Sequence, residues 1–138
     1  MSIASDSYIV YCGHDSECLS LLREGLADEE FRLASVASAE ELLKILQGEP
    51  RPDLLILDST CLEGDLSHLT EALHALQLKT TALLALIADD EQNNESLITG
   101  FYERGFHDVL IKPVRLAYLK TKVRVWAMRM HSERQNTP

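Results

Sequence analysis

The order of apolar and polar positions predicts that strands and helices alternate along the whole 138-residue chain. Short runs rich in apolar, β-branched and aromatic residues have the length of strands, and they lie at 8–12, 31–36, 53–57, 82–88 and 109–111. Between these runs, apolar residues recur every three or four positions, which is typical of helices that bury one face. The predicted helices begin near residues 16, 38, 66, 96 and 116.

Local signals support several of the predicted helix ends. Ser38 is followed three residues later by Glu41, which is the capping-box pattern of a helix start. Gly105 follows the fourth predicted helix at the position where glycine commonly ends one. The last helix is expected from residue 116 to about Ser132.

Five strand–helix units of this kind predict an α/β fold. Most of the strands are too apolar to alternate, which favours a parallel sheet covered by helices on both faces. Right-handed crossovers then give a doubly wound sandwich, whose functional site lies at the carboxyl ends of the strands. We expect one domain over residues 1–132, with 133–138 as a tail or the start of a linker.

The composition is that of an ordinary globular protein, with 46% hydrophobic and 25% charged residues. No apolar run approaches the ~20 residues of a membrane span, and the polar start lacks a basic signal-peptide region. These features predict a cytoplasmic protein without membrane contact. Three cysteines (Cys12, Cys18 and Cys61) without CxxC spacing argue against a disulfide framework or a zinc ribbon.

The net charge of −9 is unevenly distributed along the chain. Residues 1–111 carry six Lys and Arg against 21 Asp and Glu, whereas residues 112–138 carry seven against one. An acidic body disfavours direct nucleic-acid binding. The basic segment either contacts an acidic partner or is simply a solvated helix face.

The candidate chemistry lies at the ends of two strands. Asp58 follows the apolar run 54–57, and Lys112-Pro113 follows the run 109–111. Both are expected at the carboxyl edge of the sheet, where an aspartate could act as a nucleophile and a lysine could stabilise negative charge.

Three strings of sequence resemble the receiver domains of two-component response regulators. They are PDLLILD ending at Asp58, ASAEELLKIL in the second helix, and GFHDVLIKP ending at Pro113, and the resemblance covers almost the whole chain. It implies a flavodoxin-like (βα)5 sheet with strand order 2-1-3-4-5. It also implies that Asp58 is equivalent to the aspartate that takes a phosphoryl group from a histidine kinase, in a domain that is not itself an enzyme.

The resemblance also assigns the residues around Asp58. Lys112 would contact the phosphate, and a cis bond to Pro113 is expected. Magnesium would bind two adjacent acidic residues after the first strand. Here Gly13 and His14 occupy those positions, and glycine offers no ligand while histidine is a poor ligand for a hard cation. Asp15 is then a substitute ligand; a register shifted by one residue makes the pair His14 and Asp15, so the metal site is predicted to be impaired in either case.

Two further departures concern the positions that detect phosphorylation in the family. Ile87 stands where a Thr or Ser hydroxyl meets the phosphate, and Val109 stands where an aromatic switch residue is usual. We therefore predict an atypical receiver, or pseudo-receiver, that acts without a cofactor as a signalling and protein-interaction module. Its expected partners are a histidine kinase or an output domain of its own chain.

Two alternatives remain open at this stage. In the first, the chain is a working phosphoacceptor: Asp15 replaces the acidic pair, Mg²⁺ binds, and a histidine kinase phosphorylates Asp58. The second is a flavodoxin-like cofactor binder, which the lack of a glycine-rich phosphate loop after the first strand disfavours. His14 could also bind a metal with Cys12 or Cys61, although a solvated histidine is the simpler interpretation.

The last helix carries a seam of apolar residues that step by three and four, as in a coiled coil. The seam consists of Leu116, Leu119, Val123, Trp126 and Met130. Its first half is interpreted as an ordinary core face, and Trp126 and Met130 are expected to project past the sheet. We therefore predict a homodimer or output-domain interface through Leu119, Val123, Trp126 and Met130, beside a partner surface on the fourth helix, fifth strand and fifth helix.

Overall fold

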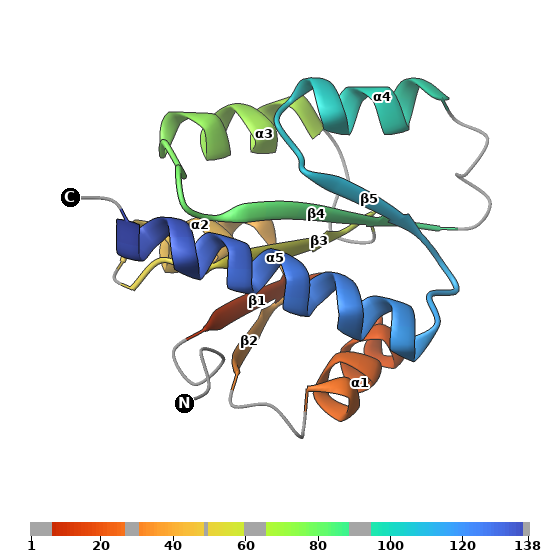
Figure 1. Cartoon of the computed structure of the whole chain (residues 1–138). Helices are drawn as coiled ribbons and strands as arrows, with labels where there is room; N and C mark the ends of the chain where they lie inside the picture. The colour runs from red at the N-terminus through yellow and green to blue at the C-terminus, as the bar shows by residue number, and fades with distance from the viewer. Residues whose placement is uncertain (1–6, 27–30, 49, 60–65, 89–94, 137–138) are drawn as a thin grey trace.

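The computed structural model describes residues 7–26, 31–48, 50–59, 66–88 and 95–136 as one sheet with helices on both faces (Figure 1). The strands are β1 (Tyr8–Cys12), β2 (Arg32–Val36), β3 (Leu54–Asp58), β4 (Ala82–Ile87) and β5 (Asp108–Ile111). The helices are α1 (Ser16–Gly25), α2 (Ala39–Gln47), α3 (Leu66–Ala75), α4 (Glu95–Glu103) and α5 (Leu116–Asn136). All strand pairs are parallel, in the order β2-β1-β3-β4-β5. The predicted fold class and strand order are confirmed.

The predicted helix signals act as expected in the structure. The Ser38 hydroxyl accepts a hydrogen bond from the backbone N–H of Glu41 at 3.1 Å and thereby caps α2. Gly105, with a φ of 94°, follows α4 in the left-handed conformation that glycine adopts without strain. The last helix is longer than predicted and runs to Asn136, because no glycine or proline interrupts its sequence. Within the described residues, no helix is both long and apolar enough to cross a membrane.

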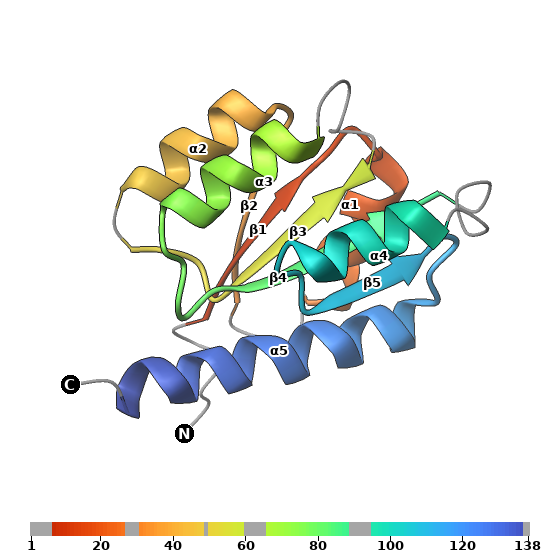
Figure 2. The same cartoon turned by 90° about the horizontal axis from the view of Figure 1, so that it is seen from above.

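The two faces of the sheet carry separate apolar cores. Helices α1 and α5 cover one face, and α2, α3 and α4 cover the other (Figure 2). Because strand residues alternate between faces, Ile9 and Tyr11 of β1 point toward α1 and α5, whereas Val10 and Cys12 point the other way. The same alternation places Leu54, Ile56 and therefore Asp58 on the α1–α5 side of β3.

The pairing register aligns the carboxyl ends of the central strands. Cys12 lies opposite Leu57, and Asp58 lies opposite Leu86. At the edge strand, Ile87 pairs with Ile111. Residues that directly follow β1, β3 and β5 consequently meet at one edge of the sheet.

The structure corrects the expectation for the last helix. Met130 is only 4% exposed, and together with Leu119 and Val123 it belongs to the core on the α1–α5 face. Trp126 packs against the same core, and its indole N–H donates to Asp108 Oδ2 at 3.3 Å. The prediction that Trp126 and Met130 project past the sheet was wrong, because α5 lies along the whole face and the seam covers core as far as Met130. These four side chains therefore leave no apolar seam open to a partner.

Candidate functional site

Asp58 ends β3 at the carboxyl edge with a side chain that is 0% exposed. The ammonium of Lys112, which directly follows β5, lies 2.8 Å from each of its two carboxylate oxygens. The backbone N–H of Lys112 donates to the Ile87 carbonyl at 2.9 Å, which ties the start of this turn to β4. The Lys112–Pro113 peptide bond that follows is cis.

Asp15 joins the same site from the start of α1. One carboxylate oxygen accepts a hydrogen bond from Lys112 at 2.7 Å. The other accepts the backbone N–H groups of Glu17 and Cys18 and so caps α1. The hydrogen bond from Lys112 lowers the pKa of the Asp15 carboxyl below its usual value. Burial opposes the charge on Lys112, but the hydrogen bonds to both aspartates outweigh it and raise the pKa of the ammonium.

Tyr11 is the member of the site that sequence reasoning missed. Its phenol O–H donates to Asp58 Oδ2 at 2.7 Å, and its oxygen accepts the backbone N–H of Asp15 at 3.2 Å. Burial, followed by the hydrogen bond to Asp58, raises the pKa of Tyr11 far above its usual range, so the phenol keeps its proton. In the sequence Tyr11 is one position of an apolar strand, and only the pairing register places it beside Asp58.

These four residues form a closed ring of hydrogen bonds. Tyr11 donates to Asp58, Lys112 donates to Asp58 and Asp15, and the backbone of Asp15 donates to Tyr11. The side chains come from β1, the end of β3, the start of α1 and the end of β5. Each of the four residues therefore has a hydrogen-bond partner within the ring. The two carboxylates and the one ammonium do not cancel in charge.

Other residues predicted for the site lie outside this ring. The side chain of Ile87 is fully buried in the core on the α2–α4 side, and Val109 packs against that same core. Alternation along β4 instead directs Ala88 toward the α1–α5 side, where it lines a hollow of about 410 Å³ together with Asp15 and Lys112. Ile87 therefore does not face Asp58.

The residues present do not fit a magnesium ion at Asp58. Both oxygens of Asp58 contact Lys112, one of them also accepts the phenol O–H, and Asp15 is divided between Lys112 and the cap of α1. Among the described residues, no group of three His, Cys, Asp or Glu side chains is arranged to hold a metal. His14 is exposed, Cys12 belongs to the core on the opposite face, and Cys61 lies outside the described residues.

A thiol near the site is also held in its neutral form. Cys18 of α1 is buried, and burial followed by the charge of Asp58 raises the pKa of its thiol to about 12. Because the thiolate is the reactive form, Cys18 is a core residue rather than a nucleophile.

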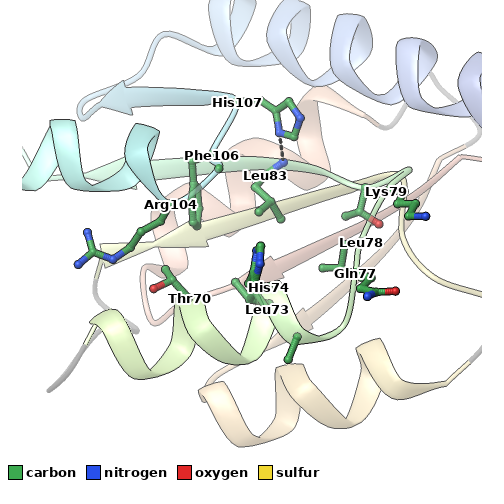
Figure 3. A pocket seen from close by; sticks show the side chains of 13 residues that line it. Thr70, Leu73, His74, Gln77, Leu78, Lys79, Leu83, Arg104, Phe106 and His107 are labelled. Atoms are coloured by element: carbon green, nitrogen blue, oxygen red, sulfur yellow. Dashed lines mark hydrogen bonds between the residues drawn. The ribbon is translucent and has the colours of Figure 1, made fainter.

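A second hollow lies at the opposite edge of the sheet, near the amino ends of β4 and β5 (Figure 3). It measures about 470 Å³, and Leu83, Phe106 and His74 line it. His107, which also lines it, accepts the backbone N–H of Leu83 at its Nδ1 atom at 3.0 Å. The last turn of α3 and the end of α4 both border this hollow. The guanidinium of Arg104, which directly follows α4, donates to the backbone carbonyl of Gly100, as a cation near the carboxyl end of a helix commonly does. This hollow is separate from the Asp58 ring.

A parallel β2-β1-β3-β4-β5 sheet with a buried carboxylate and a lysine at its carboxyl edge is typical of the receiver-domain fold, and several solved structures with the same fold are signal receiver domains. One is the signal receiver domain of a protein described as a Luxo repressor from Vibrio parahaemolyticus, with 20% identity, a TM-score of 0.79, and 96% of this chain and 98% of that chain covered. A second is the signal receiver domain of an HD domain-containing protein from Pseudomonas fluorescens Pf-5, with 21% identity, a TM-score of 0.77 and 95% and 93% covered. Full-length FixJ from B. japonicum matches with 18% identity and a TM-score of 0.74 over 91% of this chain and 59% of that chain.

At these identities the likeness establishes the fold. No protein-family model matches the chain, and no curated protein is significantly similar to it in sequence.

Proposed function

We propose that this chain is an atypical receiver domain, a non-enzymatic signalling and protein-interaction module of two-component type in which Asp58 is withdrawn from magnesium-dependent phosphorylation. The observation that carries this proposal is the wholly buried carboxylate of Asp58, held by Lys112 and Tyr11 at 2.8 and 2.7 Å.

The chemistry of phosphoryl transfer explains why this arrangement opposes reaction. A carboxylate nucleophile must present a free oxygen to the phosphorus in line with the leaving group. The developing charge on the phosphoryl oxygens also needs a metal ion beside the lysine. The contacts of both Asp58 oxygens with Lys112 and Tyr11, and the use of Asp15 by Lys112 and the cap of α1, support the proposal.

An interaction role is supported by the outer surface of α4, β5 and α5. Tyr102, Ile111 and Tyr118 are exposed by 48, 39 and 50%. Exposed aromatic side chains are frequent anchors of protein interfaces. Lys122 of α5 lies over the Tyr118 ring and is paired with Asp108 at 3.0 Å, so the apolar and aromatic side chains are the features of this surface that suit a protein partner.

The proposed partner is a histidine kinase or an output domain of a longer chain. FixJ supports the second choice, because the match spans 59% of that chain and leaves the rest of FixJ beyond the receiver-like part. We also propose that the α4–β5–α5 surface can hold two copies of this chain together as a homodimer. Sedimentation velocity over a wide concentration range tests it, and Ile111→Lys is expected to abolish any dimer by placing a charge in the interface.

The decisive test of the lost phosphorylation uses beryllofluoride, which mimics an aspartyl phosphate. The wild-type protein is incubated with Mg²⁺ and beryllofluoride, and bound fluoride is followed by ¹⁹F NMR. We expect no signal from a protein-bound species. A bound signal that needs Mg²⁺ and disappears in Asp58→Asn would replace this proposal with the phosphoacceptor alternative, in which Asp15 supports the metal.

A further inference from the structure

Gly13 occupies a position where the structure has no room for a side chain. A β carbon built there would lie 2.5 Å from Asp58 Cβ, 2.6 Å from the Tyr11 hydroxyl oxygen and 2.9 Å from Tyr11 Cζ. Carbon atoms in contact prefer separations of about 3.5 to 4 Å. Any other residue at this position would therefore displace Tyr11, Asp58 or the end of β1.

Tyr11 cannot easily move aside. Tyr11 is 1% exposed and lies in the apolar core between the sheet and the helices α1 and α5. Its hydroxyl is fixed from two directions, by donation to Asp58 and by acceptance from the backbone of Asp15. Displacing the phenol would break two members of the closed ring and leave a buried carboxylate with fewer donors.

We propose that Tyr11 is a built-in plug of the phosphoacceptor site, and that Gly13 is the residue that the plug requires. This inference rests on the proposed function and deepens it. The acidic pair of an active receiver has not simply been lost, because the phenol fills the space into which a side chain at position 13 would project. The neutral phenol of Tyr11 donates a hydrogen bond to the Asp58 carboxylate, at the place where receiver domains would bind a divalent cation.

The proposal predicts that the metal site cannot be rebuilt from the acidic residues alone. The test compares the wild-type protein with Gly13→Asp/His14→Asp and with the same pair combined with Tyr11→Val. Mn²⁺ binding is measured by electron paramagnetic resonance of the free ion. We expect the triple variant to bind Mn²⁺ at least tenfold more tightly than the wild type and the double variant, since removal of the phenol frees the end of β1 to move away from Asp58.

The control is Asp58→Asn added to the triple variant, which should abolish the binding. Two results would overturn the plug: a double variant that binds Mn²⁺ as tightly as the triple variant, or a triple variant that is folded by circular dichroism and binds none. If wild-type protein itself forms the magnesium-dependent beryllofluoride adduct, the plug and the proposed function both fail. If the wild type is inert but the double variant binds Mn²⁺ as tightly as the triple variant, only the plug fails.

A second measurement covers the case in which the acidic variants do not fold. Gly13→Ala is made in the wild type and in Tyr11→Val, and the urea midpoint is recorded for all four proteins. The contact with Asp58 Cβ is common to both backgrounds, so the difference between the two losses isolates Tyr11. We expect Gly13→Ala to lower the midpoint clearly less in the Tyr11→Val background. Equal losses in the two backgrounds would show that Tyr11 does not fill this space.

Discussion

Strand β3 has a buried aspartate at each end, and the two differ in what holds them. Asp53, immediately before the strand, accepts the backbone N–H of Tyr8 at 2.9 Å. Asp58, the last residue of the strand, accepts hydrogen bonds from the ammonium of Lys112, which directly follows β5, and from the phenol of Tyr11 on β1. Both carboxylates are 0% exposed, so burial alone does not mark a functional site. The distinguishing feature of Asp58 is the convergence of side chains that lie 47 and 54 positions away in the sequence.

The largest effect is expected from Lys112→Met. This change removes the ammonium from both oxygens of the buried Asp58 carboxylate, and Asp15 loses the same partner. Removing one partner of a buried ion pair costs about 3 to 5 kcal/mol of unfolding free energy. Urea unfolding at pH 7 measures this loss. A loss below about 1 kcal/mol would mean that the Asp58–Lys112 pair contributes no more than a surface ion pair.

Tyr11→Phe should have the next largest effect, because it keeps the ring and removes only the hydroxyl. A hydrogen bond to a charged group contributes about 1.5 to 3 kcal/mol, and we expect a loss in that range in urea unfolding. Tyr8→Phe is the matched control, since Tyr8 lies on the same strand but outside the ring. A smaller loss for Tyr11→Phe than for Tyr8→Phe would contradict the importance of the phenol.

At the other end of β3, Asp53→Asn should cost about 1 kcal/mol or less. The amide oxygen of asparagine can still accept the N–H of Tyr8, so the main interaction survives. The same urea experiment measures it beside Lys112→Met. If Asp53→Asn proved as costly as Lys112→Met, the carboxylate charge at the amino edge would be as important as the one in the ring.

The fold and two members of the site, Asp58 and Lys112, could be predicted from the sequence for the same reason. Periodicity fixes which segments are strands and helices, and parallel strands bring their carboxyl ends to one edge, so Asp58 and Lys112 were placed together. Tyr11 could not be found in this way, because in the run YIVYC it is indistinguishable from a core residue until the pairing register sets its distance from Asp58. For Ile87, the resemblance to receiver domains indicates a position along β4 but not the face of the sheet to which the side chain points.

The extent of α5 along the sheet could not be predicted from the sequence for a related reason. Its apolar seam is visible in the sequence, but whether Trp126 and Met130 cover core depends on how far the helix runs along the sheet. That distance is set by the packing of α5 on the α1–α5 face, to which Met130 still belongs. Sequence periodicity reports which residues share a helix face and says nothing about where that face ends.

The smallest predicted effect is a pH dependence of stability that arises from Asp15. Because Lys112 lowers the pKa of Asp15 in the folded state, Asp15 contributes stability that is present above its unfolded pKa of about 3.9. That contribution is lost as the pH falls through the lower folded value. Asp15→Asn removes this dependence while keeping the cap of α1, since asparagine caps helices about as well as aspartate.

Urea unfolding of both proteins between pH 7 and pH 3 measures the difference. With a carboxylate that is 26% exposed, we expect Asp15→Asn to be less stable by about 0.5 to 1 kcal/mol at pH 7, with the gap closing below about pH 4. At the alkaline end the ion pairs lose stability once the pH rises through the raised pKa of Lys112, above its ordinary value of about 10.4. A gap between the two proteins that stays constant down to pH 3 would mean that Asp15 acts only as a helix cap, and the ring around Asp58 would then be held by Tyr11 and Lys112 without it.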